Sequence, residues 1–133
     1  MHKIDRALIW NIMIPLTVGA VIYITGGGQT YLGQIIGVVP QISYPETIRN
    51  YACDVLWSYA LMISTYICLS NRRVALGITV LFIILTESLQ ILERFPGTFD
   101  PMDIVVEIIT AAVACLVTIY VSGGLKHEER KDH

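Results

Sequence analysis

Four apolar stretches, each about as long as a bilayer is thick, constrain this chain more than any other feature. A transmembrane helix needs about 20 mostly apolar residues, and four segments satisfy this: 7–25, 51–69, 74–92 and 101–121. Only 15% of the residues are charged, whereas soluble domains average roughly 25%. The sequence therefore predicts an all-α integral membrane bundle of four transmembrane helices, forming one domain over residues 1–133.

The first stretch has one alternative interpretation, because Lys3 and Arg6 precede it as basic residues precede the core of a signal peptide. Its apolar core is longer than the about 7 to 15 residues of a signal peptide, and no Ala-x-Ala pattern follows it. We expect an uncleaved first span that contains Pro15, a residue that membrane helices tolerate.

A Gly-rich segment, 26–43, separates the first helix from the second. It has five glycines and an apolar run that is too short to cross a bilayer. The glycine triplet at 26–28 lacks the Lys-Ser/Thr of a phosphate-binding loop, so it is interpreted as a linker. We expect the segment to form either a surface loop or a re-entrant hairpin at the membrane interface.

The helix ends carry local signals. The Ser-Tyr-Pro-Glu pattern at 43–46 is typical of a capping box with proline in the first turn, which predicts a second helix over 44–69. Residues 70–73 then predict a tight turn. Asp100 before Pro101 predicts an N-cap followed by a proline at the first position of the fourth helix.

The distribution of basic residues predicts the orientation of the bundle. With four spans and a cytoplasmic N-terminus, seven of the nine basic residues lie inside and two outside, as the positive-inside rule requires. The inside group is Lys3, Arg6, Arg72, Arg73, Lys126, Arg130 and Lys131, and the outside pair is Arg49 and Arg94. We expect both termini to be cytoplasmic. The net charge of −2 offers no basic patch, so no nucleic-acid partner is expected.

Most of the acidic residues fall on the opposite, outer side. Three of them, Asp54, Glu87 and Glu107, lie inside different spans, at depths of roughly 5 to 9 Å below the outer boundary. An acid facing lipid at the centre of a span costs about 2.5 to 3.5 kcal/mol. We therefore expect these carboxyl groups to face one another inside the bundle.

Helical spacing extends this acidic group. Glu87, Gln90 and Arg94 recur on one face of the third helix, and Asp103 shares a face of the fourth helix with Glu107. The predicted binding residues are Asp54, Glu87, Gln90, Arg94, Asp103 and Glu107. Crowded carboxyl groups are held either by a shared proton or by a hard cation, so a divalent cation is one candidate cofactor, although no metal ligands are assigned.

Some of these acids also have purely structural interpretations. Asp100 is expected to be only a helix cap, and Glu87 could form a structural ion pair with Arg94 or Arg49. Asp54 and Glu107 have no such local partner in the sequence, which favours a functional site for both.

The polar residues resemble the pattern of the VanZ-like family of small bacterial membrane proteins. The matching segments are Glu87-Ser88-Leu89-Gln90, Gly97-Thr98-Phe99-Asp100-Pro101-Met102-Asp103, and then Glu107, Thr110 and Ala114. Asp54 matches the aspartate that opens the preceding family helix, and Glu107 replaces the usual asparagine. The resemblance implies a multi-pass protein of the bacterial cytoplasmic membrane, linked in some relatives to low-level resistance to glycopeptide antibiotics such as teicoplanin. It implies no established reaction.

Three functions follow from an acidic site at this depth. The first is a cell-envelope protein that recognises a lipid-linked headgroup in the outer leaflet. Its expected partner is a membrane lipid or a lipid-linked envelope precursor, and the sequence is also compatible with a homo-oligomer. The second is a membrane-embedded hydrolase or transferase with Glu87 and Asp103 as candidate acid and base. The third is a small proton-coupled transporter, which is disfavoured because the acids are shallow and the first helix has none at its centre.

Overall fold

The computed structural model describes residues 3–26, 42–91 and 100–129, and these residues form α-helices and short connections, with no strand among them. The helices are α1 (Lys3–Thr25), α3 (Glu46–Leu69), α4 (Arg72–Gln90) and α5 (Pro101–Glu129). All four are long and apolar enough to cross a membrane, which confirms the predicted helical class. The predicted Gly-rich segment lies largely outside the described residues, at 27–41.

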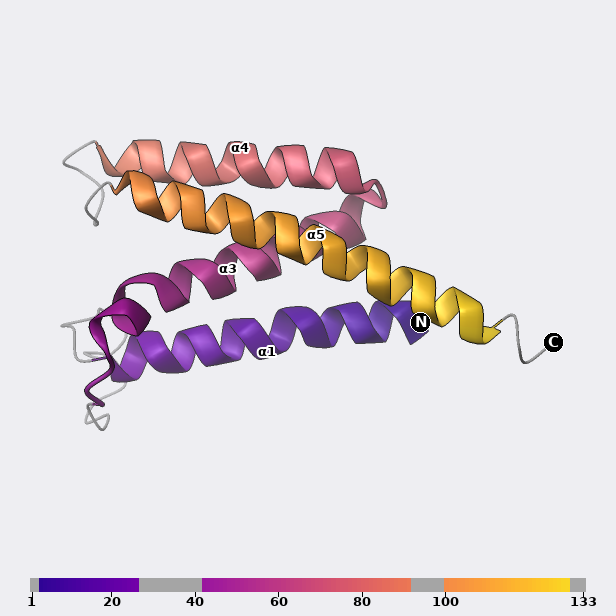
Figure 1. Cartoon of the computed structure of the whole chain (residues 1–133), viewed down its shortest axis with the longest axis horizontal. Helices are drawn as coiled ribbons and strands as arrows, with labels where there is room; N and C mark the ends of the chain where they lie inside the picture. The colour runs from indigo at the N-terminus through magenta and orange to yellow at the C-terminus, as the bar shows by residue number, and fades with distance from the viewer. Residues whose placement is uncertain (1–2, 27–41, 92–99, 130–133) are drawn as a thin grey trace.

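The helices run alternately up and down (Figure 1). As a result, the end of α1, the start of α3, the end of α4 and the start of α5 lie at one end of the bundle, which we call the α3/α5 N-terminal end. Among the described helices, α3 and α5 each pack against the other three, while α1 and α4 pack only against α3 and α5. Helix α5 continues beyond its predicted end at 121 to Glu129.

Polar contacts attach α1 to α3 and to the residues just before it. The Tyr59 hydroxyl of α3 donates a hydrogen bond to Asn11 Oδ1 at 3.0 Å. The backbone N–H of Ile42 donates to the carbonyl oxygen of Thr25 at 2.8 Å, and the hydroxyls of Thr25 and Tyr44 are 2.8 Å apart. Residue 42 therefore lies next to the C-terminal end of α1.

The start of α3 differs from the prediction. The helix begins at Glu46, and its N-cap, Pro45, has extended backbone angles and forms no side-chain capping hydrogen bond. The capping box predicted at 43–46 is therefore wrong, and so is a helix start at Tyr44. The helical conformation is disfavoured for Tyr44 because it precedes Pro45, and the Tyr44 hydroxyl contacts Thr25 at the end of α1.

The turn between α3 and α4 confirms the predicted tight connection. Ser70 has a left-handed backbone with φ of 56°, and its N–H donates to the Tyr66 carbonyl. Asn71 then caps α4, because its Oδ1 accepts the backbone N–H groups of Arg73 at 3.1 Å and Val74 at 3.3 Å. This cap makes α4 begin at Arg72, two residues before the predicted start, and α4 ends at Gln90.

Replacing Asn71 with alanine is expected to destabilise the fold by about 1 kcal/mol, because it leaves two N–H groups of the first turn of α4 without their acceptor. Asn71→Asp keeps the acceptor and is expected to change the stability little. Unfolding of the full chain in mixed micelles measures both. Equal stabilities of Asn71→Ala and Asn71→Asp would contradict this role of the cap.

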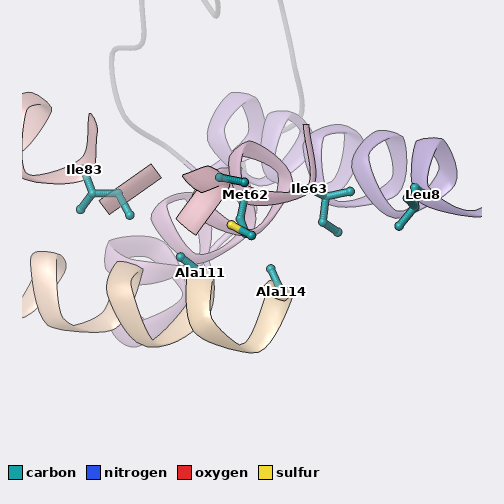
Figure 2. Packing of buried hydrophobic residues seen from close by; sticks show 7 residues of the cluster. Leu8, Met62, Ile63, Ile83, Ala111 and Ala114 are labelled. Atoms are coloured by element: carbon teal, nitrogen blue, oxygen red, sulfur yellow. The ribbon is translucent and has the colours of Figure 1, made fainter. Parts of the chain in front are cut away.

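The core lies where α3 crosses its neighbours. Seven apolar side chains form it, and in Figure 2 Met62 extends from α3 toward Ala111 on α5. They are Leu8, Met62, Ile63, Ala75, Ile83, Ala111 and Ala114. The two alanines of α5 let the backbones of α3 and α5 approach closely, which is the usual way membrane helices pack. Many larger apolar side chains are exposed on the outside of the bundle, as expected for surfaces that contact lipid.

Candidate functional site

Three helices bring carboxyl groups together at the α3/α5 N-terminal end. Asp54 lies in the third turn of α3, Glu87 in the last turn of α4, and Asp103 and Glu107 in the first two turns of α5. These four residues are called the carboxyl cluster below. Because helices that follow one another along the chain run in opposite directions, positions that are far apart in the sequence reach the same level of the bundle.

The packing faces of α4 and α5 carry the two glutamates inward. On α4 every fourth residue is buried, and Glu87 ends the series of Ala75, Thr79 and Ile83. On α5, Glu107 begins the buried series that continues with Ala111, Ala114, Thr118 and Ser122. Each glutamate therefore occupies the next position of the buried face of its helix, where the repeat would otherwise place an apolar core residue.

Glu87 is almost completely buried, with 5% of its surface exposed. Gln90, one turn later on α4, donates a hydrogen bond from Nε2 to Glu87 Oε1 at 2.8 Å. This contact agrees with the predicted shared face of the two residues. The other oxygen, Glu87 Oε2, is buried and has no hydrogen-bond partner among the residues that the structure describes.

Glu107 is buried further, with 2% of its surface exposed, and within the described part of the chain its Oε2 also has no hydrogen-bond partner. It lies within electrostatic range of the carboxyl groups of Asp54, Glu87 and Asp103. Buried polar atoms in native proteins are almost always hydrogen-bonded. Two buried carboxyl oxygens without a hydrogen-bond partner in one cluster therefore require an explanation.

The two aspartates of the carboxyl cluster are half-buried. Asp54 on α3 lies within electrostatic range of Asp103 on α5, so the cluster spans the α3–α5 contact. Asp100 has a separate role, because its Oδ1 accepts the backbone N–H of Met102 at 2.9 Å. The prediction that Asp100 caps α5 is therefore confirmed.

Two predicted partners of the carboxyl cluster cannot be placed. Arg94 lies outside the described residues, and the same is true of the side chain of Arg49. A structural ion pair of Glu87 with either arginine is therefore neither seen nor contradicted. Within the described ranges, no group of three His, Cys, Asp or Glu side chains has an arrangement that could hold a metal ion.

Three completely buried hydroxyl residues were not predicted from the sequence. They are Ser58, Thr79 and Thr118, all with 0% of their surface exposed. The hydroxyls of Ser58 and Thr118 donate to carbonyls of their own helices at 3.2 and 2.7 Å, and Thr79 donates to the sulfur of Met62 at 3.7 Å. Because short hydroxyl side chains can bond their own helix, they enter an apolar face without a distinctive sequence signal.

An apolar groove lies between α1 and α3. Its volume is about 300 Å³. It is lined by Trp10, Asn11, Ile14, Pro15, Val55, Leu56 and Tyr59. The lining on α3 begins directly after Asp54 and continues toward the middle of the helix, so the groove lies deeper along α3 than the acid does.

Comparison of the chain with family models, with curated proteins and with solved structures finds no match. The resemblance to the VanZ-like family therefore rests on the sequence pattern of the polar residues, and any function must be argued from the carboxyl cluster itself.

Proposed function

We propose that this chain is a VanZ-like, multi-pass protein of a bacterial cytoplasmic membrane whose carboxyl cluster binds the headgroup of a lipid or lipid-linked envelope precursor. The observation that carries the proposal is the pair of buried, unpartnered oxygens, Glu87 Oε2 and Glu107 Oε2. A buried polar group without a hydrogen bond costs about 1 to 3 kcal/mol. A bound headgroup with hydrogen-bond donors would remove that cost.

The level of the cluster supports a lipid ligand. Glu87 and Glu107 lie roughly 5 and 9 Å from the nearest ends of their helices, at three and six residues. This is the depth at which headgroups meet acyl chains. With the orientation expected from the basic residues, the cluster faces the outer leaflet.

A membrane-embedded hydrolase or transferase is the second candidate. The observation that favours it is that Glu87 is buried while Asp103 is half-buried within electrostatic range of it, since carboxyl groups in unlike surroundings can act as acid and base. Transport is not proposed, because side chains with 0% exposure, including Met62, Ile83 and Ala111, fill the middle of the bundle.

The test is to extract the full chain with its surrounding membrane in polymer-bounded discs and to identify retained lipids by native mass spectrometry. We expect the wild type to retain one lipid species above its abundance in the bulk membrane. The variant Glu87→Gln/Glu107→Gln is expected to lose that enrichment, because an amide cannot replace the charge. Asp100→Asn serves as the matched control, because its carboxyl group is already used by the α5 cap.

A wild type whose lipids match the bulk membrane would overturn the proposed function. Turnover of a lipid-linked precursor by the purified chain, lost in both Glu87→Gln and Asp103→Asn, would replace it with the second candidate.

A further inference from the structure

We propose that the group held between Glu87 and Glu107 is a primary ammonium, so that the carboxyl cluster selects an aminated headgroup. This inference rests on the proposed function and names the chemical class of its ligand. Neither the sequence pattern nor the resemblance to the VanZ-like family assigns such a ligand.

The charge of the cluster is the first argument. Four carboxyl side chains and one amide, that of Gln90, meet at this end of the bundle. The arginines of α4 whose position is described, Arg72 and Arg73, are at the opposite end of that helix, roughly 20 Å or more from Glu87. A cationic group is attracted by such a cluster, and the attraction is strong in surroundings of low dielectric constant.

The number of donors is the second argument. A primary ammonium has three N–H donors and no acceptor. It can donate to Glu87 Oε2 and Glu107 Oε2 and still has one donor left for a water molecule. A single sugar hydroxyl has one donor and would leave one of the two buried oxygens unpartnered. Charge-assisted hydrogen bonds are also roughly twice as strong as neutral ones.

Among the described residues, no group of three His, Cys, Asp or Glu side chains could hold a metal ion, whereas two carboxylate acceptors are enough to bind one ammonium. The ammonium could belong to a lipid headgroup or to a small soluble amine, and the experiment must separate these two sources.

The experiment uses the full chain in phosphatidylcholine discs that contain one probe lipid at a time. The probes are phosphatidylethanolamine, its N-acetylated form and phosphatidylglycerol, and retention is measured by native mass spectrometry. Free ethanolamine is added as a competitor in a separate arm. We expect phosphatidylethanolamine to be retained at least about tenfold over the other probes, which corresponds to about 1.4 kcal/mol.

The variant Glu87→Gln/Glu107→Gln is expected to lose this preference, and Asp100→Asn to keep it. If the double variant does not fold, the N-acetylated lipid still tests the proposal on the wild type, because acetylation removes the charge and two donors from the same headgroup. Equal retention of the acetylated and free amines would overturn the ammonium assignment.

The outcomes separate this inference from the proposed function. Preferred retention of phosphatidylglycerol that depends on the two glutamates would overturn the ammonium assignment and leave headgroup binding in place. Binding of free ethanolamine without retention of any lipid would support the ammonium and overturn the lipid ligand. The absence of any retained probe, lipid or amine, would overturn both.

Discussion

Replacing Glu107 with methionine is expected to stabilise the folded chain in ligand-free detergent and to abolish retention of the lipid. Glu107 has 2% of its surface exposed, one oxygen without a partner and three carboxyl groups within electrostatic range. Methionine has a similar length and no polar atom, so it fills the same space without these costs. The expected gain in the free energy of unfolding is about 1 to 3 kcal/mol.

The measurement is unfolding in mixed micelles, combined with lipid retention in discs. Ile109→Met provides the matched control, because Ile109 is on the same helix with 58% of its surface exposed; its effect is expected to stay within about 0.5 kcal/mol. A gain in stability together with lost binding is the behaviour of a residue kept for function. If Glu107→Met were less stable than the wild type, the carboxyl group would be a structural partner in the fold, and its assignment to ligand binding would be wrong.

Replacing Met62 with alanine is expected to cause the largest loss of stability in the chain. Met62 is completely buried in the core, where it contacts the hydroxyl of Thr79 through its sulfur. Truncation of buried methionine in soluble proteins costs about 2 to 5 kcal/mol. We expect about 2 kcal/mol here, because lipid is as apolar as the core and the loss is mainly one of packing contacts.

Two controls separate packing from side-chain identity. Met62→Leu conserves the volume and is expected to cost less than about 1.5 kcal/mol. Leu116→Ala removes a similar side chain from α5 at a position that is 64% exposed, and it is expected to have a small effect. Similar losses for Met62→Ala and Leu116→Ala would contradict the assignment of the core to the contact of α3 with its neighbours.

The four helices could be predicted because their cause is local. Length and apolarity decide whether a segment can cross a bilayer, and both are read directly from the residues. The two predicted helix N-caps had different outcomes. Asp100 bonds a backbone group two residues away, and the prediction was correct. The local pattern at 43–46 predicted the start of α3 wrongly, because the helix begins only after Pro45.

The level of the acids could also be predicted, because a helix rises by a constant amount per residue. Their surroundings could not. In the sequence, Glu87 and Asp103 are both acids near the same end of the bundle. In the structure, Glu87 is buried and its Oε2 lacks a hydrogen-bond partner, whereas Asp103 is half-buried. Which carboxyl groups lose contact with solvent depends on how the four helices pack against one another.

The sequence by itself thus determined that the chain forms apolar helices of membrane-spanning length, and at which level along those helices the carboxyl groups stand. Only the tertiary structure decided which of these groups are buried and left without partners. The physical reason is that span length and depth follow from the geometry of a single helix, whereas burial of Glu87 and Glu107 depends on side chains that other helices contribute.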